Sequence, residues 1–140
     1  MAVAESAAGG LIAAALTARA GSSAYFRGGI VAYDDQSKTG LLGIDRELFE
    51  RHGSVSREAA EAMAQAARRL FQADYGVGET SIAGPGGGTD AKPVGLSYVA
   101  LAGASGTRSE EHRFQGTRAD IRQAIVQAAA RLVAEVIPIE

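Results

Sequence analysis

Ser23, Tyr33 and Lys38 have the residue types and spacing that could together attack a carbonyl carbon. A serine becomes a nucleophile only beside a base, and lysine can be that base when burial or a cationic neighbour lowers its pKa. Tyr33 ends an expected strand and Lys38 lies in the segment that follows, so both side chains can point to one pocket. Spacing alone leaves open the alternative of a turn serine and a solvated lysine.

A glycine-rich loop is the second candidate, because the fifteen residues 81–95 hold five glycines and two prolines. Glycine permits positive φ and close approach of backbone N–H groups to a ligand. Such N–H groups suit an anion or an amide, so we expect the loop to form one wall of a pocket. The loop lacks the Gly-Lys-Ser/Thr of a P-loop, and no helix opens directly from it as in a dinucleotide fingerprint. An ordered surface connection is the alternative.

Arg118 and Arg122 form the third candidate, on one face of the first turns of the last expected helix. Cations there oppose the helix dipole, which favours negative charge at this end. One interpretation is local pairing with Asp120 or Glu110. The other is an anion, a phosphate or a carboxylate, held jointly by arginine and the helix N-terminus.

Composition excludes several classes of protein. A net charge of −2, 21% charged residues and 6% aromatic residues without tryptophan do not favour a nucleic-acid partner. No cysteine is present, and His52 and His112 lack a second ligand at zinc spacing, so we expect neither a metal nor another cofactor. The N-terminus has no basic signal region, and the apolar run 11–16 is too short to span a bilayer. We expect a soluble, cytoplasmic protein without a membrane partner.

Helix and strand signals alternate along what we expect to be a single domain, residues 1–140. The expected helices cover residues 7–19 (capped by Ser6 and Gly21), 34–43, 45–51, 56–72 and a last helix opened by a capping box of Thr117 and Asp120. The expected strands cover residues 28–33, 75–82, 95–102 and 110–114, with a hairpin turn at 103–106. This order predicts an α/β fold, a three-layer α/β/α domain with a mixed, mostly parallel sheet.

Several ordered motifs across the whole chain resemble the C-terminal domain of the competence-damage protein CinA, the nicotinamide mononucleotide amidohydrolase family. The motifs are Ala4-Glu5-Ser6-Ala7-Ala8-Gly9-Gly10, Gly21-Ser22-Ser23-Ala24-Tyr25-Phe26, Gly28-Gly29-Ile30-Val31-Ala32-Tyr33, Lys38, Gly53-Ser54-Val55-Ser56, Ile82-Ala83-Gly84-Pro85 and Lys92-Pro93-Val94-Gly95. Compared with that family, the chain lacks the usual N-terminal helix and most of the first strand.

The resemblance implies a metal-free hydrolysis of nicotinamide mononucleotide to nicotinic acid mononucleotide and ammonia. By resemblance, Ser23 is the nucleophile, with Lys38 and Tyr33 as the base and proton-relay pair. The same resemblance makes a small-molecule nucleotide the partner, bound by a set of four residues: Ser6, Gly84, Gly86 and Arg118.

The chain departs from the family pattern at several places around these residues. Family members usually carry Cys-Thr at Ala7-Ala8, Val-Thr-Gly at Glu79-Thr80-Ser81 and Gly-Asp-Arg at Gly116-Thr117-Arg118. The alternative is therefore a catalytically weak relative that serves as a nucleotide-binding or interaction module. The missing N-terminal segment would uncover apolar surface or a sheet edge, so we also expect a homodimer.

Overall fold

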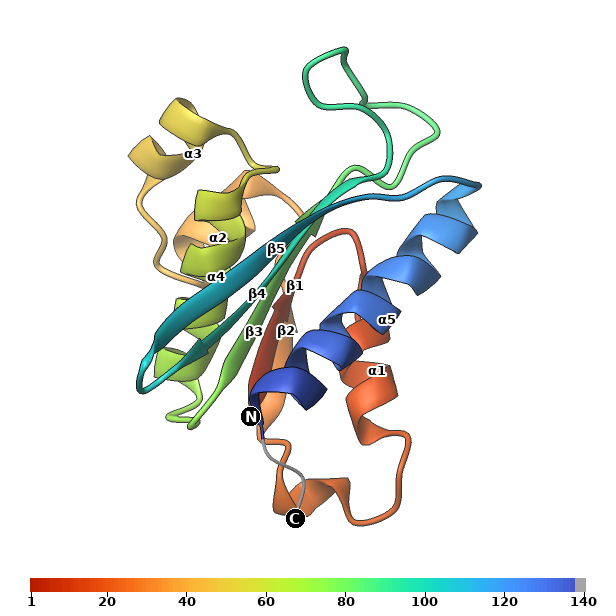
Figure 1. The fold of residues 1–140 in the computed structure, drawn as a ribbon. Helices are drawn as coiled ribbons and strands as arrows, with labels where there is room; N and C mark the ends of the chain where they lie inside the picture. The colour runs from red at the N-terminus through yellow and green to blue at the C-terminus, as the bar shows by residue number, and fades with distance from the viewer. Residues whose placement is uncertain (138–140) are drawn as a thin grey trace.

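The chain folds around a five-stranded sheet, seen in a computed structural model that describes residues 1–137 (Figure 1). The strands are β1 (Ala2–Glu5), β2 (Gly28–Val31), β3 (Gly76–Ser81), β4 (Leu96–Gly103) and β5 (Gly106–Arg113). The helices are α1 (Leu11–Thr17), a short 3₁₀ helix η1 (Ser22–Ala24), α2 (Asp35–Gly40), α3 (Arg46–His52), α4 (Arg57–Leu70) and α5 (Arg118–Val136).

The sheet has the order β2-β1-β3-β4-β5 and is mixed. β2, β1 and β3 run parallel, whereas β4 pairs antiparallel with both β3 and β5. Helices cover both faces, with α4 on one side and α1 and α5 on the other (Figure 1). The predicted three-layer α/β/α fold is therefore confirmed.

Glycines in β3 allow α4 to approach the sheet closely. A Cβ on Gly76 would lie 2.1 Å from the Ala64 carbonyl oxygen, and a Cβ on Gly78 would lie 2.2 Å from that of Ala60. Ala60 and Ala64 are themselves fully buried. Backbone therefore packs directly against backbone at this contact, which fixes the position of β3 in the sheet.

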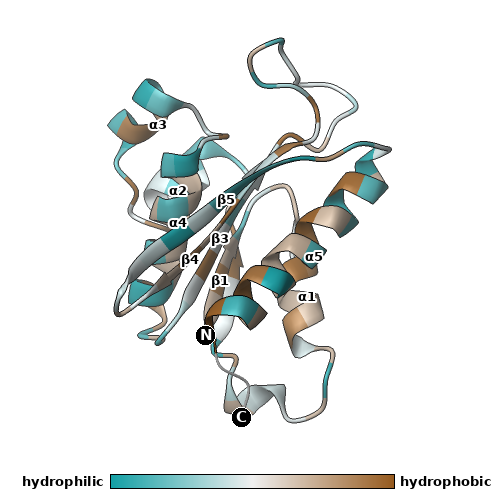
Figure 2. Cartoon of the chain, viewed as in Figure 1, coloured by the Kyte–Doolittle hydropathy of each residue, from teal (hydrophilic) through white to brown (hydrophobic). Residues whose placement is uncertain are grey.

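The opposite face of the sheet holds the larger apolar cluster. Val3 and Val77 pack with residues of α1 and α5, among them Ile12, Ile121 and Ile125. β5 lies at the sheet edge and is hydrophilic along its length, in contrast to the hydrophobic stretches of β4 (Figure 2). Within residues 1–137, no helix is long and apolar enough to cross a membrane.

The N-terminal region differs from the prediction. The expected helix 7–19 is shorter, because Ser6–Gly10 form a turn and the helix begins at Leu11. Gly9 and Gly10 have φ of 60° and 100°, a left-handed backbone that cannot continue a helix. Ser6 is therefore not the N-cap; instead the Glu5 carboxylate accepts hydrogen bonds from the N–H groups of Ile12 and Ala13.

A second difference is β1, because no strand was expected at residues 2–5, which form an interior strand of the sheet. The remaining elements agree with the prediction more closely. Ser56 caps α4, and Thr117 and Asp120 form the capping box of α5. Leu70, the last residue of α4, is 47% exposed.

Candidate functional site

The carboxyl ends of the three parallel strands meet at one edge of the sheet and surround a cavity of about 280 Å³. Ligand sites of open α/β sheets lie outside this edge, because the loops there converge. The cavity is lined by Ser6 and Ala7 after β1, by Tyr33, Asp35 and Lys38 after β2, by Ser54 and Val55, by residues 80–84, 86 and 87, and by Arg118 of α5.

Ser6 directly follows β1 and is 6% exposed. Its backbone N–H is held by the Glu79 carboxylate, at 3.0 Å from Oε2. Within residues 1–137 its hydroxyl makes no hydrogen bond. Every fully buried side-chain nitrogen or oxygen atom in this range has a hydrogen-bond partner, so the Ser6 hydroxyl oxygen is not fully buried. The Ser6 hydroxyl therefore retains access to the cavity.

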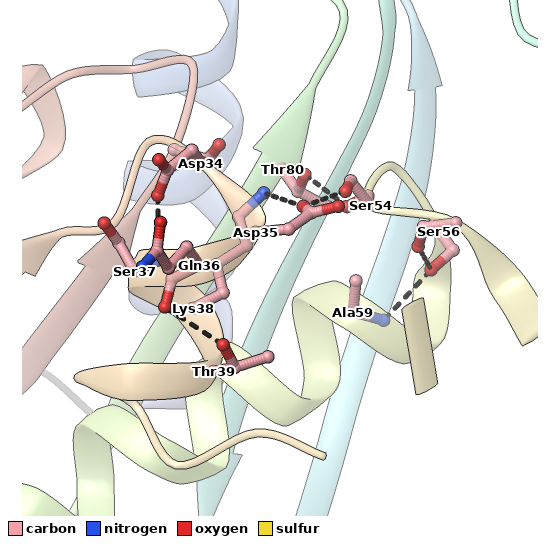
Figure 3. A network of polar contacts seen from close by, with 12 residues as sticks. Asp34, Asp35, Gln36, Ser37, Lys38, Thr39, Ser54, Ser56, Ala59 and Thr80 are labelled. Carbon is pink, nitrogen blue, oxygen red and sulfur yellow. Dashed lines mark hydrogen bonds and ion pairs between the residues drawn. The ribbon is translucent and has the colours of Figure 1, made fainter. Parts of the chain in front are cut away.

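Lys38 reaches the same cavity from α2 and is only 2% exposed. Burial lowers the pKa of its amine, while the carboxylates of Asp35, Glu79 and Asp34 oppose that shift. The closest carboxylate contact is between Lys38 Nζ and Asp35 Oδ1, at 3.9 Å (Figure 3). A lysine held in this way can supply a neutral amine more readily than a solvated one.

Ser54 and Thr80 support the Asp35 side of the cavity (Figure 3). The Ser54 hydroxyl donates to Asp35 Oδ1, and the Thr80 hydroxyl donates to the Ser54 carbonyl at 2.7 Å. Asp34 caps α2 by accepting from the Ser37 N–H at 2.8 Å, as expected for a helix start. The Asp34 cap thus fixes the start of the helix that carries Lys38, and Ser54 holds Asp35, the ion-pair partner of Lys38.

Arg118 joins three parts of the cavity wall. Its Nη2 donates to the Tyr33 hydroxyl and its Nη1 to the Gly84 carbonyl oxygen, both at 2.7 Å. Tyr33 is 58% exposed, so it lies at the mouth of the cavity rather than in its floor. Arg122, one turn later in α5, instead donates to the carbonyl oxygens of Ala7 and Ala8.

The glycine-rich loop lines the cavity with Gly84, Gly86 and Gly87. Lys92 anchors this loop, because its Nζ donates to the carbonyl oxygens of His52 and Val55, each at 2.7 Å. The loop projects beyond the sheet from the end of β3 (Figure 1). Contacts outside the loop therefore hold it at two places, at Lys92 and at Gly84, whose carbonyl oxygen accepts from Arg118.

Glu79 and Ser81 form a buried polar pair on β3 next to the cavity. Glu79 is fully buried, and its carboxylate accepts from the N–H groups of Ser6 and Ala8 and from the Ser81 hydroxyl. Burial raises the pKa of Glu79, and these three hydrogen bonds oppose the rise. Two of these partners, Ser6 and Ala8, lie 73 and 71 positions away from Glu79 in the sequence.

Ser23 is not part of this site, which corrects the expected grouping with Tyr33 and Lys38. It lies in η1, before β2, whereas Tyr33 and Lys38 follow β2. Ser23 lines a different cavity with Met1 and Tyr75, which stand at the beginnings of β1 and β3. In Figure 1 this segment lies beside the N-terminus, at the opposite end of the molecule from the glycine-rich loop.

The structure thus brings together Ser6, Tyr33, Lys38, Gly84, Gly86 and Arg118 and separates Ser23 from them. A useful signal was present in the sequence: Ser6 follows an apolar run, as Tyr33 does, and parallel strands end at the same edge. No group of three His, Cys, Asp or Glu side chains that could hold a metal ion occurs in the part of the chain that the structure describes.

Comparison with known proteins agrees with this fold. The CinA-like protein of Mycolicibacterium vanbaalenii is 52% identical over 136 residues, which cover 95% of this chain and 32% of that protein. The chain spans about a third of the length of the curated relatives it matches. Among solved structures, competence/damage inducible protein CihA from Agrobacterium tumefaciens is similar with a TM-score of 0.93 and 41% identity, covering 96% of this chain and 82% of that one.

A second solved structure, competence damage-inducible protein A from Klebsiella pneumoniae, has a TM-score of 0.92 and 30% identity, with 96% of this chain and 84% of that chain covered. The family model for the CinA C-terminal domain matches residues 1–137, which is nearly the entire sequence. On these grounds the chain belongs to the CinA C-terminal domain family.

Proposed function

We propose that this domain is an amidohydrolase that converts nicotinamide mononucleotide to nicotinic acid mononucleotide and ammonia, with Ser6 as the nucleophile. The observation that carries the proposal is the cavity shared by the Ser6 hydroxyl and the buried Lys38 amine. Ser6 takes the nucleophilic role that the family resemblance implied for Ser23, because Ser23 lies at the opposite end of the sheet from Lys38. The carboxamide is a suitable substrate because its carbonyl carbon accepts an oxygen nucleophile.

The reaction would proceed through two tetrahedral intermediates. The Ser6 oxygen bonds to the carboxamide carbon while neutral Lys38 accepts the hydroxyl proton. That proton then passes to the amide nitrogen, the C–N bond breaks, and ammonia leaves. A water molecule attacks the ester carbon and gives one proton to Lys38. The bond between that carbon and the Ser6 oxygen then breaks, and Lys38 returns the proton to the Ser6 oxygen as the acid product is released.

Backbone N–H groups are the expected donors to the oxyanion. The N–H groups of Ser6 and Ala8 are bound to Glu79, so neither is free for this role. The Ala7 N–H has no hydrogen-bond acceptor within residues 1–137 and lies next to the nucleophile. We assign the oxyanion contact to Ala7, and the orientation of the nucleotide to Tyr33, Arg118 and the N–H groups of Gly84 and Gly86.

The decisive experiment measures ammonia release from nicotinamide mononucleotide by purified protein. Ser6→Ala should abolish turnover, whereas Ser23→Ala is the matched control and should retain it. Loss of activity in Ser23→Ala with normal folding would return the nucleophilic role to Ser23. No ammonia release at high concentrations of the unsubstituted protein would contradict the enzyme assignment.

A nucleotide-binding module without turnover is the second candidate function. It is favoured by the engagement of the Ser6 and Ala8 N–H groups by Glu79, which leaves few donors beside the nucleophile. Calorimetry that shows nucleotide binding, together with an assay that shows no ammonia, would select this candidate over the enzyme.

We also retain self-association as a proposal. Within residues 1–137, β2 has no strand on its outer side. Val31 of β2 is 47% exposed, and Leu41, which follows α2, is 60% exposed. An unpaired edge beside apolar side chains favours pairing with a second copy. Light scattering should then give the mass of a homodimer, and a monomer at all concentrations would contradict it.

A further inference from the structure

Glu79 and Ser81 are two residues apart on β3, so their side chains point to the same face of the sheet. Glu79 is fully buried, whereas Ser81 is 9% exposed and lines the cavity that also contains Ser6. The Ser81 hydroxyl lies 2.7 Å from Glu79 Oε1. A buried carboxylate is thus connected to the cavity through one hydroxyl group.

The direction of this hydrogen bond follows from the other contacts of Glu79. Its Oε2 accepts from the N–H groups of Ser6 and Ala8, each at 3.0 Å, and an amide N–H can only donate. The ionised Glu79 carboxylate has no proton to donate, so the Ser81 hydroxyl is the donor to Oε1. The single hydroxyl proton of Ser81 is therefore committed to Glu79.

A serine oxygen whose proton is committed can only accept further hydrogen bonds. Within residues 1–137, no protein group donates to the Ser81 oxygen. Its lone pairs are consequently left for a donor that enters the cavity. The site should favour a ligand group that carries N–H or O–H and should disfavour a group that only accepts.

We propose that Ser81 is a specificity-determining residue that accepts a hydrogen bond from the carboxamide NH₂ of the substrate, and that Glu79 is the positioning residue that fixes the Ser81 hydroxyl as an acceptor. The inference rests on the proposed amidohydrolase function. The acid product has two acceptor oxygens and no N–H in place of the carboxamide, so it meets the lone pairs of Ser81 unfavourably. Ser81 thereby distinguishes substrate from product and promotes product release.

The test measures the dissociation constants of nicotinamide mononucleotide and of nicotinic acid mononucleotide by calorimetry. All measurements use the Ser6→Ala background, which prevents turnover during titration. The readout is the preference for the amide over the acid. Ser81→Ala removes the acceptor and should lower this preference about tenfold, the effect of losing one good hydrogen bond.

Glu79→Gln reverses the polarity of the Ser81 contact. The amide oxygen of the glutamine must face the N–H groups of Ser6 and Ala8, so its NH₂ donates to the Ser81 oxygen. The Ser81 proton then points into the cavity and favours the acid. The amide preference should fall below that of Ser81→Ala, and the double variant should return to the Ser81→Ala value.

Ser97→Ala is the matched control. Ser97 pairs with Ser81 in the register of β3 and β4, is fully buried and donates to the Gly95 carbonyl oxygen. It is not among the described residues that line the cavity. Its loss should weaken both nucleotides equally, if at all, and leave the amide preference unchanged.

Three outcomes would overturn the inference in whole or in part, and they can be told apart. If neither nucleotide binds, the proposed function fails and the role of Ser81 fails with it. If both bind but Ser81→Ala or Glu79→Gln leaves the preference unchanged, the polarity role alone is wrong. A double variant that retains the Glu79→Gln preference would show that the charge of Glu79 acts directly and not through Ser81.

Discussion

Arg118 Nη2 lies 2.7 Å from the Tyr33 hydroxyl oxygen, although the two residues are 85 positions apart in the sequence. The contact joins the beginning of α5 to the segment after β2 across the mouth of the cavity. Because Nη1 of the same guanidinium binds the Gly84 carbonyl oxygen, one planar group holds three separate segments in a fixed relation.

Arg118→Lys should therefore impair substrate binding more than the chemical step. A lysine keeps the charge but has one ammonium group, which cannot satisfy both acceptors with the geometry of a guanidinium. We expect KM to rise about tenfold, which corresponds to roughly 1.4 kcal/mol, while kcat changes less. Steady-state ammonia release measures both. Arg113→Lys is the control, since Arg113 is exposed on β5 and pairs with Glu111; an equal rise of KM in both variants would contradict the assigned role of Arg118.

The pH profile should report on Lys38. Activity requires its neutral amine, and burial lowers its pKa, so the rate should rise with pH below the range of a solvated lysine. The Asp35 carboxylate stabilises the charged amine and thus opposes the lowering. Asp35→Asn removes that charge while keeping an oxygen acceptor for Ser54. The pKa of Lys38 should then fall further, and the rising limb of the kcat profile should move to lower pH.

Glu50→Gln provides the control for charge at a distance. Glu50 is exposed and pairs with Arg46 on α3. Its removal should leave the profile in place because exposed charges are strongly screened. A rising limb that stays fixed in Asp35→Asn would show that Lys38 is not the group whose deprotonation controls the rate.

The fold was largely predictable from local signals, whereas the site was predictable only in part. Caps such as Ser56 and Thr117 and the hairpin after β4 are encoded by neighbouring residues, so these elements can be predicted from the sequence. The placement of Ser6 depends on Glu79, which lies 73 positions later in the sequence. The Glu79 carboxylate accepts a hydrogen bond from the Ser6 N–H, and Ser6 does not cap α1. Local propensity does not encode such a contact.

Ser23 illustrates the same limit for the site. Its motif lies close to Tyr33 and Lys38 in the sequence, but β2 runs between them. A strand carries the chain along its own length, so the residues before it and the residues after it lie at opposite ends of the sheet. Strand order and direction would have excluded Ser23, and these depend on long-range pairing that the sequence pattern left undetermined.

Gly78→Ala should destabilise the domain without changing the residues of the cavity. The added Cβ would lie 2.2 Å from the Ala60 carbonyl oxygen and 2.4 Å from the Ala64 nitrogen, so α4 and β3 must separate. Overpacking of this kind costs about 1–3 kcal/mol. Urea denaturation measures the change. Gly40→Ala at the end of α2 meets no atom within 4 Å and should change stability little; comparable losses in both variants would argue against close helix–sheet packing as the cause.

Lys92→Met should loosen the glycine-rich loop. The substitution removes two charged hydrogen bonds, from Nζ to the carbonyl oxygens of His52 and Val55, and these are the contacts that tie the loop to the segment before α4. Amide hydrogens of residues 86–91 should exchange with deuterium about tenfold faster, while those of β4 keep their rate.

Arg108→Met is the matched control for Lys92→Met, because it also removes one positive charge. Its guanidinium pairs with Glu110 and Glu135, away from the cavity. This variant should leave exchange in the loop unchanged. If KM for the nucleotide rises only in Lys92→Met, the loop acts as a wall whose position matters for binding. Unchanged exchange in Lys92→Met would instead mean that the loop's own turn is sufficient to hold it. That turn is closed by the Thr89 N–H, which donates to the Lys92 carbonyl oxygen, and by the Lys92 N–H, which donates to the Thr89 hydroxyl.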